Sequence, residues 1–191
     1  MRFAQIRKES EDINTIYSGK FRVTSPFGER TLNGSREFHS GIDVVGVTDR
    51  YVCSACGGYV AVSQIVTDKR DRTWEWGNYV CVIGDDGRQY YYCHLARRLV
   101  GAGQRVEAGD HVGVEGNTGY SFGSHCHFEV RDCSGAINPA QILGIENKIG
   151  VYGVDWREAC RKKYGFSDAT MSYLDGYEYA ADLYRKLGER G

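Results

Sequence analysis

The sequence is poor in histidine and proline, carries almost no net charge and has no long apolar run. Its 191 residues include 5 histidines and 2 prolines, and the formal net charge at pH 7 is −1. Without a basic surplus, the chain lacks the electrostatic footprint of a protein that binds nucleic acid or an anionic membrane. No run of about 18 apolar residues occurs, so we expect no membrane-spanning helix. The hydrophobic fraction of 41% is typical of a globular protein with its own core.

Residues 1–12 lack the apolar core of a secretory signal peptide. We therefore expect the protein to be made without Sec-type export. If it acts outside the cell in which it is made, another route must carry it there.

Seven cysteines, an odd number, leave at least one thiol unpaired, as expected for synthesis in a reducing compartment. Cys53 and Cys56 have the C-x-x-C spacing of a zinc knuckle or a redox pair, but no second pair follows at a matching spacing. Most of the cysteines alternate with apolar residues in strand-like runs, where a free thiol behaves as a small hydrophobic side chain. We expect buried or half-buried thiols, and a redox or secondary metal role is the alternative.

The middle of the chain has the pattern of antiparallel β-structure. Glycine is abundant at 25 residues, and short runs of β-branched and aromatic residues alternate with turn signals. A strand is expected at residues 21–25, and another at 127–131. Residues 78–83 lead through Gly-Asp-Asp-Gly into 88–93, which predicts a hairpin. A second hairpin is expected between the valines of 106–114.

The composition changes near residue 140, and helical signals follow. Asp155 with Glu158 three residues later resembles a capping box, so a short helix is expected to run to Tyr164 and stop at Gly165. A second helix is expected from Ser167 or Asp168 to just before Gly188. Its apolar stripe at helical spacing comprises Tyr173, Tyr177, Ala180, Tyr184 and Leu187. The chain thus divides into an N-terminal segment (1–20), a β domain (21–140) and a two-helix tail (141–191).

Four of the five histidines lie in three short blocks. The first is an H-x-x-x-D formed by His39 and Asp43, the second contains His94, and the third is an H-x-H formed by His125 and His127. Imidazole and carboxylate are ligands that zinc prefers, and three protein ligands leave one position open for water. On a strand, His125 and His127 face the same side. Each block alone is more often structural, but all three beside glycine-rich loops indicate an enzyme with a mononuclear zinc site.

These residues also belong to a wider set of motifs. From about residue 23 to 139 the chain resembles the M23 metallopeptidases, the lysostaphin-like or LytM-like endopeptidases of bacterial cell walls. The matching segments are 24–30, 38–43, 77–80, 92–95, 106–113, 116–119 and 125–130. Cys126 replaces the usual apolar residue between the last two histidines, and Cys93 stands where a small residue is common. Neither departure removes a ligand.

The resemblance implies an antiparallel β-sheet domain with a groove. In that groove His39, Asp43 and His127 would bind one zinc ion, and His94 and His125 would form the catalytic pair. The implied reaction is peptide-bond hydrolysis by a metal-activated water with histidine acid/base assistance. No glutamate lies inside a ligand motif to act as base, so a histidine is its natural substitute. Which of the two histidines is the base stays open.

Three further residues complete the set of candidates. Asn117, in the glycine-rich loop 116–119, and Tyr120 beside it are candidates for contacts with substrate. His111 lies on the far arm of the predicted hairpin 106–114, and we expect it to be an exposed side chain with no part in the chemistry.

The helical tail bears on biology more than on chemistry. With the missing signal peptide, it resembles modules of phage or prophage lytic enzymes and tail-associated peptidases. Such proteins reach the wall by holin-type release or on a virion, so the tail is a candidate for docking to the wall or the virion; the alternative is that the helices only pack against the β domain.

Three functions stay open. The first is a zinc endopeptidase that cuts peptidoglycan stems or cross-bridges, the second a catalytically silent wall-binding or activator module, and the third a structural virion component.

Overall fold

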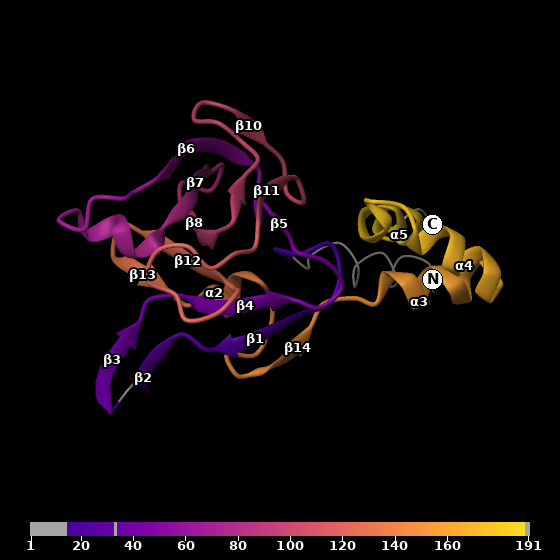
Figure 1. Ribbon diagram of the computed structural model, residues 1–191, viewed down its shortest axis with the longest axis horizontal. Helices are drawn as coiled ribbons and strands as arrows, with labels where there is room; N and C mark the ends of the chain where they lie inside the picture. The colour runs from indigo at the N-terminus through magenta and orange to yellow at the C-terminus, as the bar shows by residue number, and fades with distance from the viewer. Residues whose placement is uncertain (1–14, 33, 190–191) are drawn as a thin grey trace.

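The computed structural model describes residues 15–32 and 34–189, so the expectation for residues 1–12 lies outside the described residues (Figure 1). Within that part of the chain, one large sheet and two small ones form a mainly β domain, and every paired strand is antiparallel, as predicted. The large sheet runs in the order β10 (Arg105–Val106), β6 (Gly58–Ile65), β7 (Asn78–Gly84), β8 (Gln89–Leu95), β12 (Cys126–Asp132), β4 (Ile42–Gly46), β1 (Phe21–Ser25) and β14 (Gly150–Tyr152), with β13 (Gly135–Ile137) on β12.

The other elements frame this sheet. A hairpin of β2 (Gly28–Leu32) and β3 (Ser35–His39) extends from it (Figure 1). A second small sheet consists of β5 (Tyr51–Cys53), β11 (His111–Val114) and β9 (Arg97–Arg98). A 3₁₀ turn, η1 (Arg72–Trp76), precedes β7, and a short helix, α2 (Pro139–Ile142), follows β13. No helix among the described residues is both long and apolar enough to cross a bilayer.

The central strand β12 separates the core from the functional face. Cys126, Phe128 and Val130 are buried in the hydrophobic core, because alternate side chains of a strand point to the same side. His127 and Glu129 therefore point to the opposite side. The register places His127 opposite Asp43 of β4. The alternation of side chains along β12 thus places one set of residues in the core and the other set in the site.

The strand predictions are mostly confirmed. The strand at 21–25 is β1, the strand at 127–131 lies within β12, and the hairpin of 78–93 is β7 paired with β8. The hairpin expected at 106–114 is wrong, because β10 pairs with β6 while β11 pairs with β5 and β9 in another sheet. The backbone between its arms bonds elsewhere: Gly109 N donates to the Ser54 carbonyl, and Ser54 N donates to that of Asp110.

The tail is helical, but it contains three helices rather than two. The first, α3 (Trp156–Tyr164), begins and ends as predicted: the Asp155 side chain accepts from Glu158 N, and Gly165 is left-handed. The expected second helix divides into α4 (Asp168–Asp175) and α5 (Ala180–Glu189). The break follows Gly176, and Tyr173 is 83% exposed, so the predicted stripe is not one buried face. The tail has its own core of Cys160, Met171 and Tyr184.

Residues just outside 21–140 also belong to the β domain. Ile16 and Tyr17 are fully buried in the main core, and β14 pairs with β1 at the edge of the large sheet. All seven cysteines are free; five are buried, Cys56 is half-buried and Cys133 is exposed.

Candidate metal centre

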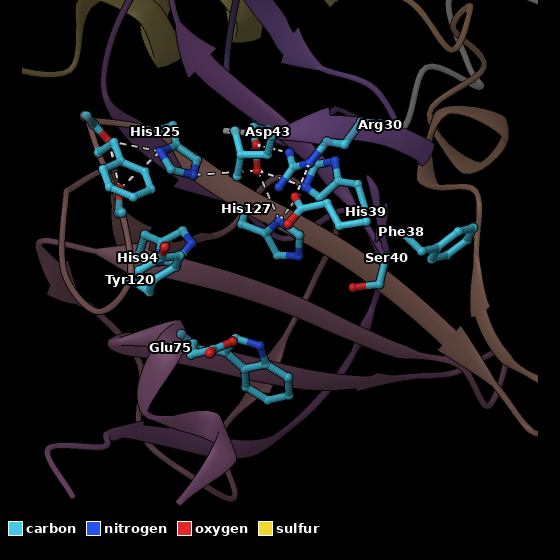
Figure 2. Close-up of a pocket in the computed structure, with 16 residues that line it drawn as sticks. Arg30, Phe38, His39, Ser40, Asp43, Glu75, His94, Tyr120, His125 and His127 are labelled. Carbon is cyan, nitrogen blue, oxygen red and sulfur yellow. Dashed lines mark hydrogen bonds and ion pairs between the residues drawn. The ribbon is translucent and has the colours of Figure 1, made fainter. Parts of the chain in front are cut away.

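Three predicted ligands converge where β3, β4 and β12 meet (Figure 2). His39 Nε2 lies 3.1 Å from Asp43 Oδ1 and 3.0 Å from His127 Nδ1, and His127 Nδ1 lies 3.0 Å from Asp43 Oδ1. Gly41, in the turn between His39 and Asp43, permits this approach. A Cβ there would lie 2.8 Å from the His127 ring and 2.5 Å from the Phe128 carbonyl oxygen.

The triangle of donor atoms fits a metal ion better than hydrogen bonds. Three atoms at mutual distances of 3.0–3.1 Å cannot all be joined by linear hydrogen bonds, whereas one cation can contact all three. Zinc with ligands at about 2.0 Å in a tetrahedron separates its ligand atoms by about 3.3 Å. Burial lowers the pKa of His127, but the carboxylates of Asp43 and Glu129, which accept hydrogen bonds from the protonated ring, outweigh burial and raise the pKa to about 9. The pocket therefore favours a positive charge.

Each candidate imidazole ligand has an acceptor behind it. His39 Nδ1 lies 2.8 Å from the Pro26 carbonyl, and His127 Nε2 lies 3.3 Å from Glu129 Oε2. A proton shared with these acceptors leaves His39 Nε2 and His127 Nδ1 with their lone pairs toward Asp43, as metal-binding histidines require. Glu129 is 1% exposed and also accepts from Ser40 Oγ at 2.9 Å and from Arg131.

Asp43 is held as a carboxylate. Burial raises its pKa, but the close contacts with His125, His127 and His39 outweigh burial and hold the pKa far below its usual range. Arg30 Nη1 donates to Asp43 Oδ2 at 3.2 Å. One carboxylate oxygen is therefore occupied by Arg30, and the other faces the two imidazoles.

His94 and His125 lie together beside the triad (Figure 2). Their ring centroids are 4.7 Å apart, and that of His94 is 6.0 Å from that of His127. His94 has a φ of 63°, which non-glycine residues rarely adopt, and the β7–β8 register shifts opposite it. Such a bulge can re-aim a side chain into a site. His125 is fixed through Ser124, whose hydroxyl donates to the buried Glu115 at 2.8 Å.

His94 and His125 both direct Nε2 toward the cleft, because each Nδ1 lies against a backbone carbonyl. The charges around the two rings differ. His94 Nδ1 lies 2.9 Å from the Thr118 carbonyl, and His125 Nδ1 lies 2.8 Å from that of Gly123. Burial, with His125 and His127 nearby, lowers the pKa of His94 to about 4. Burial also lowers the pKa of His125, but Asp43, 3.5 Å from His125 Nε2, outweighs it and raises the pKa.

All five residues line one cleft of about 460 Å³. Its walls come from the β2–β3 hairpin, from η1 and from the loop at 120–123. Tyr120 lies in this lining and is 52% exposed, and its contact with substrate stays a prediction. Asn117 is exposed but does not line the cleft. The other aromatic and charged lining residues are Phe38, Trp76, Phe122, Arg30, Glu37 and Glu75.

His111 is not the free, exposed side chain that we expected. Its Nε2 lies 3.0 Å from Asp182 Oδ2 of α5, and its ring stacks on Tyr51 at 4.6 Å. The sequence pattern could not reveal this contact, because the partner helix follows some 70 residues later and docks through polar atoms.

Sequence reasoning also missed the residues that orient the ligands. Glu129 could have been found, because it lies two residues after His127 on a strand and therefore shares its face. Arg30, which donates to Asp43, carries no such signal, since it reaches the cleft from β2.

The chain matches the sequence profile of Peptidase family M23 over residues 37–139, more than half its length. It is 34% identical over 111 residues to the peptidoglycan DD-endopeptidase ShyC of Vibrio cholerae, a match that covers 56% of this chain and 24% of that protein. The first curated relatives are matched over only 24–32% of their length.

Solved structures agree with this match. The catalytic domain of the prophage-encoded M23 protein EnpA from Enterococcus faecalis superposes with a TM-score of 0.52 at 30% identity, over 62% of this chain and 88% of that one. A zinc-containing peptidase from Vibrio cholerae superposes with a TM-score of 0.54 at 26% identity, over 67% of this chain and 38% of that one. The similarity lies in the β domain that carries the cleft, since the profile match ends at residue 139.

Proposed function

This chain belongs to peptidase family M23, and we propose that it is a zinc-dependent endopeptidase that hydrolyses peptide bonds in the stems or cross-bridges of bacterial peptidoglycan. The observation that carries the proposal is the convergence of His39, Asp43 and His127 beside the pair His94 and His125 in one cleft. ShyC is a peptidoglycan endopeptidase, and one structural neighbour contains zinc, which supports both halves of the proposal.

One zinc ion per chain would be held by His39 Nε2, Asp43 Oδ1 and His127 Nδ1. When bound, zinc supplies Lewis acidity that polarises a peptide carbonyl and acidifies water. Pro26 and Glu129 keep the two imidazoles in the ligating tautomer. Two imidazoles and one carboxylate leave the site with a net positive charge, which such chemistry needs.

His94 and His125 supply the proton transfers. Each shares its Nδ1 proton with a backbone carbonyl, so each Nε2 is directed toward the cleft. One imidazole can accept the proton of the attacking water while the other donates to the oxyanion or the leaving amine. The fixed rings need no reorganisation during the reaction, which is the benefit of preorganised polar groups.

The cleft suits an extended peptide. Trp76 of η1 and Tyr120 and Phe122 of the 120–123 loop offer ring surface, and Arg30, Glu37 and Glu75 offer charges of both signs. Peptidoglycan stems carry both carboxylate and amine groups, so such a lining can contact them along their length. The expected phage or prophage origin, and the route by which the protein reaches a wall, stay predictions.

Digestion of purified peptidoglycan tests the proposal. We expect new amino groups to appear with the wild-type protein and none with His127→Ala, and mass spectrometry of the fragments to identify the scissile bond. Zinc content is measured on the same preparations, because zinc content and amino-group release together separate an enzyme from a silent module. A protein that binds wall and one zinc but releases no amino group would be a binding or activator module, and the proposed hydrolysis would be wrong.

A further inference from the structure

A second pocket lies between the β domain and the tail. It has a volume of about 350 Å³ and shares no residue with the cleft of the metal centre. Tyr51 and His111 line it from the β domain, and Tyr177, Tyr179 and Tyr184 line it from the tail. The proposed peptidase function uses none of these side chains.

Tyrosine rings form a concave wall of this pocket. The ring centroids of Tyr51 and Tyr179 are 5.8 Å apart at 41°, and those of Tyr179 and Tyr177 are 6.0 Å apart at 69°. Because neighbouring rings are inclined, their faces point in different directions around the cavity. Tyr177 is 55% exposed and Tyr179 is 40% exposed, so part of each ring is accessible to a ligand and not buried in the core. The negative face of a tyrosine ring attracts a cation.

The charges around the pocket leave an excess of carboxylate. Two of its acidic residues have cationic partners: Asp182 lies 3.0 Å from His111, and Asp175 lies 2.8 Å from Arg157. The other two, Asp49 and Glu178, form no ion pair within the described part of the chain. Asp49 Oδ1 accepts from Tyr51 N at 2.8 Å. Burial is the main cause that raises the pKa of Asp49, and nearby Asp182 adds to it, while the Tyr51 amide and His111 act in the opposite direction.

Ring faces and unpaired carboxylates in one cavity select for one ligand chemistry. An anion would be repelled by Asp49 and Glu178, and a small metal ion would make no use of the rings. An organic cation satisfies both, because its alkyl surface packs on the rings while its charge faces the carboxylates. We propose that this pocket binds an organic ammonium group, with Tyr51, Tyr177 and Tyr179 around it and Asp49 and Glu178 as its counter-charges.

Isothermal titration of the whole 191-residue chain tests this site with three small probes. Choline represents a quaternary ammonium, n-butylamine a primary ammonium, and 3,3-dimethylbutan-1-ol is the neutral isostere of choline. We expect saturable binding of at least one cation and none of the neutral alcohol. Tighter binding of choline would identify a quaternary ligand, and tighter binding of n-butylamine a primary amine. Equal binding of the alcohol, or no binding of either cation, would overturn the proposal.

Variants place the binding in this pocket. Tyr177→Ala should weaken cation binding about two- to fivefold, the equivalent of one partly exposed cation–π contact. Asp49→Asn should weaken it as well, and the exposed Glu178→Gln provides a second charge variant if Asp49→Asn does not fold. Tyr173→Ala, an exposed tyrosine of the same tail outside this pocket, is the matched control and should bind as the wild type does.

The result does not depend on the peptidase. His94→Ala, a change in the cleft, should leave cation binding unchanged. If Tyr177→Ala, Asp49→Asn and Glu178→Gln all bind the cation like the wild type, the cation lies elsewhere and the assignment to this pocket is wrong.

Discussion

At the scale of single residues, the proposed metal centre depends on the residues that orient its ligands, and Glu129 is one of them. Glu129 is buried, contacts His127 Nε2 and accepts from Ser40 and Arg131. Replacing this carboxylate with an amide removes the charge that keeps the His127 proton on Nε2. We therefore expect Glu129→Gln to weaken zinc binding about 10- to 100-fold, the usual cost of losing an outer partner of a metal-binding histidine.

Competition with a chromogenic chelator measures this loss without any substrate. Asp132→Asn is the matched control, because Asp132 is an exposed carboxylate at the end of the same strand. Unchanged zinc affinity in Glu129→Gln, with a melting temperature like that of the wild type, would remove Glu129 from the site.

Ligands and proton carriers should separate in substitution experiments. His39→Ala, Asp43→Ala and His127→Ala should each lose zinc and activity together, because two remaining ligands hold zinc poorly. His94→Ala and His125→Ala should keep zinc but lower the rate about 10²–10⁴-fold, the usual contribution of a positioned acid or base. Metal analysis and initial rates on the same samples decide the matter. A metal-free His94→Ala or His125→Ala protein would make that histidine a ligand.

The cleft residues could be predicted because the sequence carries their spacing directly. His125 and His127 share a strand face, and the strand register then sets His127 opposite Asp43. The orienting contact of Arg30 could not be predicted, because it depends on where the β2–β3 hairpin places Arg30 relative to β4. The same holds for His94, whose direction results from a bulge and a positive φ that no residue pattern announces.

At the scale of elements, an ion pair between His111 and Asp182 links α5 to the β domain. His111 and Asp182 are each 19% exposed, and Ser18 Oγ also donates to Asp182 at 2.5 Å. The contacts with Asp182 and then Cys53 raise the pKa of His111 to about 10, while Asp49 and Arg185 are the other charges nearby. Because its unfolded pKa is about 6.5, the stabilisation is complete below that pH and is lost as the pH rises through 10.

We therefore expect the melting temperature of the wild type to fall relative to that of His111→Gln as the pH is raised from about 6.5 to 10. The difference between the two proteins isolates this histidine from tyrosines and lysines that titrate in the same range. Hydrogen exchange of α5 amides should speed up over the same interval. A difference that does not change with pH would show that the pair contributes no charge-dependent stability.

Sequence signals predicted an element correctly where residues within one turn determine its ends. They failed where a segment distant in the sequence forms the hydrogen bonds or the packing instead. The cap at Asp155 and the glycine at 165 fixed the ends of α3 because both act within one turn. Residues 106–114 have the turn residues of a hairpin, but the backbone groups of Gly109 and Asp110 form their hydrogen bonds with Ser54. The expected long helix divides after Gly176 because Tyr184 and Leu187 pack onto Cys160 and Met171, while Tyr173 stays in solvent.

At the scale of the whole molecule, the described chain has a main core in the β domain and a separate core in the tail. Figure 1 shows the tail helices α3, α4 and α5 grouped to one side of the sheets. The contacts between them are largely polar or aromatic. Lys20 Nζ lies 2.8 Å from Asp155, Asp182 receives Ser18 and His111, and Tyr51 contacts Tyr179. Exposed ion pairs such as Lys20–Asp155 contribute only about 0–1 kcal/mol each. The β domain and the tail are therefore held together by a few polar and aromatic contacts and, in the described part of the chain, share no hydrophobic core.

A chain that ends after Gly153 should separate the two roles proposed for the tail. The cut must fall there because β14 pairs with β1, and an earlier end would strip the edge of the large sheet. We expect the shortened protein to bind zinc and cleave a small soluble peptide as the full chain does, since every ligand and both catalytic histidines remain. Binding of organic cations should disappear, because the tail supplies most of that pocket.

If the tail docks the enzyme, the same truncation should reduce hydrolysis of intact walls far more than hydrolysis of the small peptide, because a second attachment raises the local concentration of substrate. Tyr177→Ala in the full chain should then show part of this selective loss without any truncation. Equal losses on both substrates, together with a large fall in melting temperature, would instead mean that the helices stabilise the β domain. That outcome would contradict the separation of cores, because helices with their own buried residues should leave without opening the main one.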